Sequence, residues 1–158
     1  MTWQPFVHRI AVTWADMDAA AIAYTGRFSY WALEAIEMFM RERIAADWYE
    51  ISIDRQIGTP FVNMNINFRS PVTPRERLQI EVIVTNTGES AVTCQLVARG
   101  DKTNKYRFDA EATFVFANNH PMKRIPIPEE FAERLRQEQA CAAARNNAAI
   151  GDMNAAPN

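Results

Sequence analysis

The 158-residue sequence is poor in cysteine, with only Cys94 and Cys141. The two are far apart and belong to no Cys-x-x-Cys or Cys/His cluster, which excludes a disulfide framework and favours a reducing compartment. No run approaches the roughly 18 apolar residues of a membrane span. The first residues also lack the basic and apolar regions of a signal peptide. We therefore expect a cytoplasmic protein that does not enter a membrane.

Histidine is equally scarce, since His8 and His120 are the only two. The chain has no Gly-x-Ser-x-Gly motif, phosphate-binding glycine loop, dinucleotide fingerprint or cluster of metal ligands. We therefore expect no metal and no resident cofactor. If the chain is an enzyme, a carboxylate is the predicted catalytic group.

The chain has no large excess of charge of either sign. Its net charge of −2 argues against nucleic-acid binding. Between residues 55 and 124, however, the sequence contains ten Lys/Arg and only six Asp/Glu. This local excess suits a small anionic ligand such as a phosphorylated cofactor, although a solvated surface accounts for it equally well.

The hydrophobic pattern predicts one α+β domain over residues 1–140. Alternation indicates strands at 6–14, 61–68, 78–87, 91–99 and 106–117. Between the first two strands, residues 27–46 are predicted to form a helix with apolar residues in most directions. Such a helix must be covered by other elements, and the predicted strands that follow indicate that a β-sheet covers it. A second helix should run from Pro128 to about Ala144. The Ala/Asn-rich tail, 141–158, is expected to be disordered.

Asp16 and Asp18 are the candidate catalytic carboxylates because they immediately precede the long helix. Thr25 is expected to be the N-cap, so that free backbone N–H groups begin the helix a few residues after Asp18. Such N–H groups stabilise a developing oxyanion while a carboxylate attacks or activates water. A thioester is a suitable substrate for a carboxylate beside such N–H groups because thiolate is a good leaving group. The alternative is that the two aspartates only shape a turn.

Residues 14–31, Trp-Ala-Asp-Met-Asp-Ala-Ala-Ala-Ile-Ala-Tyr-Thr-Gly-Arg-Phe-Ser-Tyr-Trp, resemble the active-site segment of hot-dog-fold acyl-CoA thioesterases of the 4-hydroxybenzoyl-CoA thioesterase family. The resemblance continues through Gly-Thr-Pro-Phe-Val at 58–62, the prolines at 71 and 74, and Arg-Ile-Pro-Ile-Pro at 124–128. It covers about residues 6–135. It implies a central helix wrapped by a five- or six-stranded antiparallel sheet, and homodimers or homotetramers with active sites between subunits.

The resemblance also implies roles for individual residues. Asp18 would be the nucleophile or general base, and the backbone N–H of Thr25 would polarise the thioester carbonyl. The implied substrate-binding residues are Tyr24, Gly26, Arg27, Trp31, Thr59 and Phe61. As an alternative, Trp31 and Phe61 are ordinary core residues. The candidates for binding the coenzyme A (CoA) phosphates are Arg69, Arg75, Arg77, Lys102, Lys105 and Arg107.

The sequence departs from the family pattern at four places. Ala21 replaces a glycine, so a positive φ there would be strained. Arg27 stands where many members have asparagine, as a ligand contact or a surface residue. Leu33 replaces an acidic residue that meets a substrate phenol, which favours an unsubstituted aromatic or aliphatic acyl group. The hairpin around Gly88 lacks the basic cluster that some members use for the CoA phosphates.

We therefore predict an acyl-CoA thioesterase that releases a free acid and CoA. A non-catalytic acyl-CoA-binding protein is one alternative. A hot-dog hydratase or dehydratase is the other, and it is less favoured because both histidines lie outside the segment that enters the helix.

Overall fold

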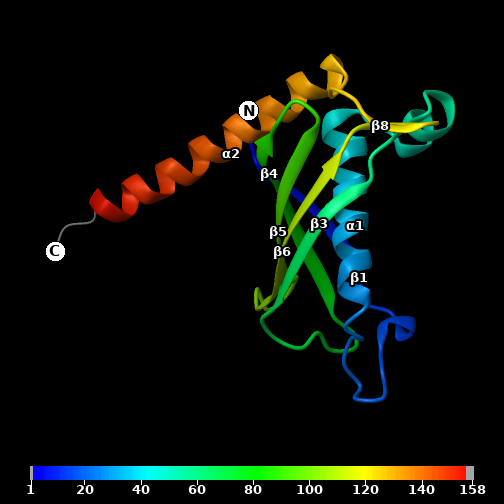
Figure 1. Ribbon diagram of the computed structural model, residues 1–158. Coiled ribbons are helices and arrows are strands. Elements are labelled where there is room, and N and C mark those ends of the chain that lie inside the picture. Colours follow the sequence, from blue (N-terminus) through cyan, green and yellow to red (C-terminus); the bar gives the residue numbers. More distant parts are fainter. Residues whose placement is uncertain (1, 156–158) are drawn as a thin grey trace.

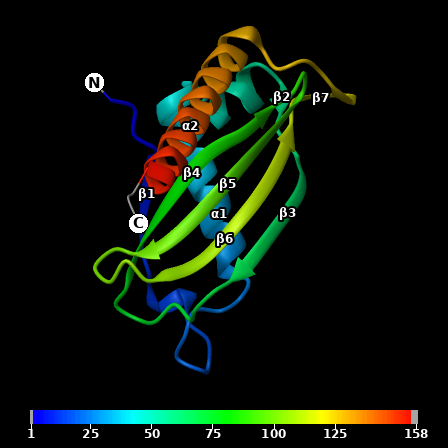
Figure 2. The same ribbon diagram turned by 90° about the vertical axis from the view of Figure 1, so that its left-hand side faces the viewer.

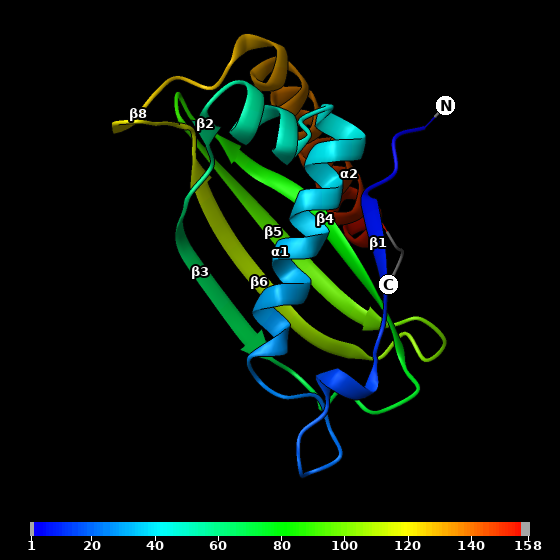
Figure 3. The same ribbon diagram turned by 90° about the vertical axis from the view of Figure 1, so that its right-hand side faces the viewer.

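Helix α1 (Arg27–Phe39) is the centre of the computed structural model, which describes residues 2–155. A π-helical turn at Met40–Ile44 extends α1, and Ala45 ends it with a φ of 59°. One antiparallel sheet curves around α1 in the order β1-β4-β5-β6-β3 (Figures 1 and 3). Its strands are β1 (Phe6–Ala11), β3 (Phe61–Phe68), β4 (Arg77–Thr87), β5 (Ala91–Gly100) and β6 (Tyr106–Val115). The predicted hot-dog arrangement is confirmed, with five strands in the main sheet.

The face of the sheet that meets α1 is apolar because every second residue of the central strands points toward the helix. The predicted alternation of β4, β5 and β6 is confirmed by burial and by register, for example Ile80 opposite Ala98 and Leu96 opposite Ala110. The helix contributes Phe28, Trp31, Ile36 and Phe39 to this core.

Strand β3 departs from the predicted alternation at its first residues. A register shift between Phe61 and Asn63 inserts a bulge into its pairing with β6. As a result Phe61 packs against the core, whereas Val62, which strict alternation with Met64 and Ile66 places on the face toward the helix, is 57% exposed. A bulge adds one residue to a strand and reverses the faces of its neighbours, so period-two counting fails there.

Four short elements close the far end of the sheet. A π-helical turn (Glu50–Asp54) follows α1, and β2 (Ile57–Gly58) pairs with β7 (Ala117–Asn119), which pairs with β8 (Met122–Arg124). This small sheet carries the chain from α1 into β3 and so fixes the position of Thr59.

Helix α2 (Glu129–Ala155) corrects the expectation of a disordered tail from residue 141. Ala142 is buried, and the side chain of Arg145 forms an ion pair with Glu81 of β4 at 3.1 Å. Alanine has the highest helix propensity, so the segment remains helical without an amphipathic pattern. Figures 2 and 3 show α2 against β4 on the side of the sheet away from α1. Residues 156–158 of the expected tail lie outside the described residues.

Candidate active site

The segment before α1 is a small hairpin fixed by the buried carboxylate of Asp16. The Thr13 backbone N–H and hydroxyl donate to Asp16 Oδ2 at 2.7 and 2.9 Å, and Arg27 Nε donates to Oδ1 at 2.6 Å. Burial, the largest single influence, opposes ionisation of Asp16, but the hydrogen bonds from Thr13 and Arg27 together outweigh it and lower the pKa of this carboxyl. Asp16 therefore anchors the hairpin to the first residue of the helix.

Asp18 lies at the tip of this hairpin and is exposed. Its backbone N–H donates to the Ile22 carbonyl at 3.1 Å, and its Oδ1 accepts the Ala20 N–H at 2.7 Å. Ala21 completes the turn with a φ of 58°, which confirms the strained backbone expected where the family has glycine. Of the two candidate carboxylates, only Asp18 remains free of a cation within the described residues.

The start of α1 differs from the prediction at Thr25. The N-cap is Gly26, with no side-chain capping bond, and Thr25 lies one residue earlier. The Arg27 N–H already donates to the Tyr24 carbonyl at 2.9 Å, so the chain turns before the helix begins. A Cβ on Gly26 would lie 2.6 Å from the ring of Tyr24, so glycine allows this aromatic side chain to fold over the helix start.

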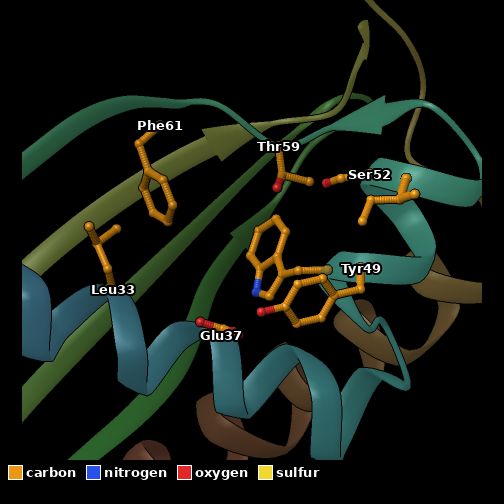
Figure 4. A pocket seen from close by; sticks show the side chains of 8 residues that line it. Leu33, Glu37, Tyr49, Ser52, Thr59 and Phe61 are labelled. Atoms are coloured by element: carbon orange, nitrogen blue, oxygen red, sulfur yellow. The ribbon is translucent and has the colours of Figure 1, made fainter.

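A hollow of about 520 Å³ opens beside the middle of α1, and we call it the mid-helix hollow (Figure 4). Its lining combines apolar walls with a polar rim: Leu33, Glu37, Trp48, Tyr49, Ser52, Ile53, Thr59 and Phe61. Thr59 enters it from the segment before β3 and Phe61 from the first position of β3, whereas Leu33 and Glu37 come from α1. Its volume is in the range of small-molecule sites.

The predicted substrate-binding residues therefore lie in three different places. Thr59 and Phe61 are brought together in the mid-helix hollow. Tyr24 is largely exposed at the helix start. Trp31 is only 2% exposed and packs against Phe28 with ring centroids 5.2 Å apart, so it is a core residue, as the alternative expected.

The hollow around Asp18, the turn hollow, is separate from the mid-helix hollow. It has a volume of about 490 Å³ and is lined by Val12, Thr13, Trp14, Met17, Asp18, Ala21, Pro74 and Arg75. Thr25 lines another hollow of about 290 Å³ together with Phe28, Phe68 and Arg69. Within one chain, Asp18, Thr25 and Phe61 thus lie in three different hollows.

A cationic hollow of about 270 Å³ adjoins the turn hollow and shares Pro74 and Arg75 with it. It also contains Arg77 and Lys102, and within residues 2–149, whose side chains are described, none of these three cations has a carboxylate partner. The acids beside them are already paired: Glu76 with Arg107 at 2.7 Å, and Asp101 with Arg9 at 3.7 Å. The free charge of this hollow is therefore positive.

Arg107 is a structural residue, which corrects its assignment to the CoA phosphates. It is 6% exposed, and its guanidinium donates to Glu76, to the Ser70 hydroxyl and to the Pro71 carbonyl. Arg69 is held by Asp109 at 2.6 Å, although it is half exposed. Lys105 is exposed and lies outside the hollows described above.

A family model described as the thioesterase-like superfamily matches residues 12–135. The chain belongs to the thioesterase-like superfamily. The resemblance to thioesterases is thereby confirmed at the level of the superfamily, and the predicted enzyme class, a thioesterase, follows from this membership. Among curated proteins, none matches the chain significantly.

Several solved structures have the same fold. A thioesterase superfamily protein from Jannaschia sp. CCS1 is 35% identical, with a TM-score of 0.78 over 85% of this chain and 92% of that one. A 1,4-dihydroxy-2-naphthoyl-CoA thioesterase from Synechocystis is 20% identical, with a TM-score of 0.77 over 84% and 96%. A Staphylococcus aureus protein in complex with CoA is 12% identical, with a TM-score of 0.81 over 89% and 87%.

The histidines of this superfamily member lie away from the helix start. His8 Nε2 and Glu34 Oε1 are 2.9 Å apart between β1 and α1, and His120 is exposed in the turn between β7 and β8. Among the side chains described, those of residues 2–149, no group of three His, Cys, Asp or Glu is arranged to hold a metal ion. Of the described helices, none is long and apolar enough to cross a membrane.

Proposed function

We propose that this protein hydrolyses acyl-CoA thioesters to a free acid and CoA, with Asp18 as nucleophile or general base. The observation that carries the proposal is the position of Asp18. It is a carboxylate without a cationic partner among the described residues, and its hollow continues over Pro74 into a hollow with unpaired cations. A CoA thioester has this arrangement of charge, with a neutral reactive carbon at one end and phosphates at the other.

The CoA phosphates are assigned here to Arg75, Arg77 and Lys102. All three line the cationic hollow and have no competing carboxylate among the described residues. Arg75 also lines the turn hollow, so it lies on the path between Asp18 and the other two cations. The neighbour solved with bound CoA and the naphthoyl-CoA thioesterase support a CoA thioester as the substrate class.

We propose that the acyl group occupies the mid-helix hollow of a second copy of the chain. Strand β3 is the end of the sheet, and it exposes Val62 and Phe68 along an edge with no strand beside it in the described residues. Such an edge is a template for pairing with another chain. Antiparallel pairing of two β3 edges would bring Phe61 of one copy next to Phe68 and the helix start of the other.

This pairing unites the hollows that one chain keeps apart. Thr25 and Phe68 line the hollow at the helix start, and Thr59 and Phe61 line the mid-helix hollow. In the dimer, or a tetramer built from it, the reactive carbon would lie between Asp18 with the Thr25 N–H of one copy and the acyl pocket of the other. The helix N-terminus would stabilise the oxyanion that forms as the thioester carbonyl is attacked. A cytoplasmic location is part of this proposal.

The test is thiol release from a panel of aromatic, short-chain, medium-chain and long-chain acyl-CoAs by wild type, Asp18→Asn and the control Asp54→Asn. Asp54 is an exposed aspartate outside the proposed site. Asp18→Asn should lower turnover by about two orders of magnitude or more, while size-exclusion chromatography shows an unchanged oligomer. Turnover close to wild type in Asp18→Asn refutes the assignment, and binding without thiol release by wild type supports the non-catalytic alternative.

A further inference from the structure

Asp16 holds both ends of the hairpin that carries Asp18. The Asp16 side chain is only 3% exposed. Its Oδ2 accepts two hydrogen bonds from Thr13, where the hairpin begins, and its Oδ1 accepts one from Arg27, in the first turn of α1. Its backbone carbonyl accepts the N–H of Tyr24, where the hairpin ends, at 2.8 Å. One residue thus joins the start of the hairpin, its end and the helix.

The hairpin has few other attachments to the rest of the chain. Residues 14–24 project beyond the end of the sheet, next to the start of α1 (Figures 1 and 3). Met17 and Ala23 pack against the core, and the Ala23 N–H donates to the Val72 carbonyl at 2.9 Å. Among the described residues, the bond from Arg27 to Asp16 is the only side-chain hydrogen bond between this hairpin and α1.

The two groups assigned to the reaction lie on either side of Asp16 and its partners. Asp18 follows Asp16 by two residues, and the Thr25 N–H, which comes directly after Tyr24, has no acceptor among the described residues. A reacting carboxylate and an oxyanion donor must be separated as the transition state requires, and an error of about 1 Å costs a factor of about 10² in rate.

We propose that Asp16 is the positioning residue of the thioesterase reaction, because it holds the Asp18 carboxylate in place relative to the Thr25 N–H. This inference rests on the proposed function. It assigns to Asp16 no contact with the substrate, so it predicts a loss of turnover without a matching loss of binding.

Asp16→Asn tests the connection while it keeps the shape of the side chain. The Thr13 N–H and the Arg27 Nε–H that face the carboxylate are donors and cannot accept. Asparagine has one oxygen and one NH₂ group, so it satisfies one of these donors and turns its NH₂ group toward the other. The variant therefore loses the connection either to the start of the hairpin or to the helix.

The experiment measures kcat for thiol release from the best acyl-CoA of the panel, and the affinity for CoA by calorimetry. Asp16→Asn should lower kcat by about ten- to hundred-fold and leave the affinity for CoA close to that of wild type. In an Asp18→Asn background, Asp16→Asn should lower kcat little further, because the carboxylate that it positions is already absent. A general loss of structure would lower kcat equally in both backgrounds.

The matched control is Glu138→Gln, outside the proposed site. The Glu138 side chain is 14% exposed and accepts hydrogen bonds from Trp3 Nε1 at 2.9 Å and from Arg43 at 3.1 Å. It joins α2 to the N-terminal segment and to the end of α1, so its loss should lower stability and leave kcat unchanged.

A milder pair of variants changes only the Thr13 hydroxyl. Thr13→Val removes its hydrogen bond to Asp16 and should lower kcat by about five-fold. Thr13→Ser keeps the hydroxyl and should retain the wild-type kcat. Valine fits the extended backbone of this position, which has a φ of −108° and a ψ of 167°.

The inference is overturned if Asp16→Asn keeps the wild-type kcat, if it lowers kcat by the same factor in both backgrounds, or if Glu138→Gln lowers kcat as strongly. Should Asp16→Asn not fold, a wild-type kcat in Thr13→Val overturns it. Loss of kcat in Asp18→Asn but not in Asp16→Asn refutes this inference alone. Retention of kcat in Asp18→Asn refutes the proposed function and this inference with it.

Discussion

Substitution of Asp109 by asparagine should destabilise the protein in a way that depends on pH. Asp109 lies on β6 beside the end of β3, and its side chain is 14% exposed. Its carboxylate accepts hydrogen bonds from Arg69 Nε at 2.6 Å, Tyr106 OH at 2.7 Å and Asn67 Nδ2 at 2.9 Å. An asparagine of the same shape loses the charge that all three donors meet.

The pKa of Asp109 sets the size of the expected loss in unfolding free energy. The pKa of Asp109 is lowered from 3.8 to about 2, mainly by the hydrogen bond from Arg69. Burial raises this pKa, but the hydrogen bonds from Tyr106 and Asn67 lower it further. This difference corresponds to about 2.4 kcal/mol of preference for the charged form. Because the Arg69 side chain is 48% exposed, solvent screens part of the interaction between Arg69 and Asp109. We therefore expect Asp109→Asn to lower the free energy of unfolding by about 1–2 kcal/mol at pH 7.

The sign of the pH dependence follows from the lowered pKa. The charged carboxylate stabilises the fold fully above the unfolded pKa of Asp109, near 3.8, and the stabilisation is lost as pH falls toward about 2. The difference in unfolding free energy between wild type and Asp109→Asn should thus be constant between pH 7 and about 5. It should then shrink steadily as the carboxyl is protonated.

Urea denaturation at a fixed protein concentration between pH 7 and pH 2.5 measures this difference. Glu111→Gln is the matched control, because Glu111 is exposed two residues further along β6 on the same face and belongs to none of the described ion pairs. The control should differ from wild type by less than about 0.5 kcal/mol at every pH. A destabilisation by Asp109→Asn that does not change with pH would refute the role assigned to its charge.

Three further predictions concern residues around the hollows. Arg107→Met should cost about 3–5 kcal/mol in urea denaturation, because it leaves the Glu76 carboxylate, whose side chain is only 10% exposed, without its cation; a loss below about 1 kcal/mol would show that Arg107 is not structural. Ala21→Gly should raise the free energy of unfolding by up to about 1 kcal/mol, since only glycine adopts a φ of 58° without strain, and a destabilised variant would contradict this. Burial raises the pKa of the Cys94 thiol to about 12. Ellman's reagent at pH 8 should therefore modify only the partly exposed Cys141 in the native protein, and both cysteines in denaturant. Rapid modification of two thiols without denaturant would count against the buried position of Cys94.

The inner face of the sheet was predictable from the sequence because burial repeats every second residue along β4, β5 and β6. The same counting failed at Val62, since a bulge depends on how β3 fits against β6 rather than on β3 itself. The tail at 141–155 was also mispredicted. Helix propensity and contacts with β4 support α2 there, and the contact between Arg145 and Glu81 joins residues far apart in the sequence.

The site was predictable in its residue types and less so in their roles. The motif identified Asp16, Asp18, Thr59 and Phe61, and the structure brings the last two into one hollow. No local pattern distinguished the buried Asp16 from the exposed Asp18. Trp48 and Glu37 carried no motif signal, and only the fold brings them together in the mid-helix hollow.

By itself, the sequence determined the superfamily, the order of helix and strands, and the segment that enters the central helix, because these follow from local periodicity and from a contiguous motif. The tertiary structure alone decided which charges are free. Arg107 is neutralised by Glu76, 31 residues away, whereas Arg75, Arg77 and Lys102 have no carboxylate partner in the described part of the chain. A side chain's partners are set by which distant segments the fold brings within a few ångströms, and that distance is not encoded in any short stretch of the chain.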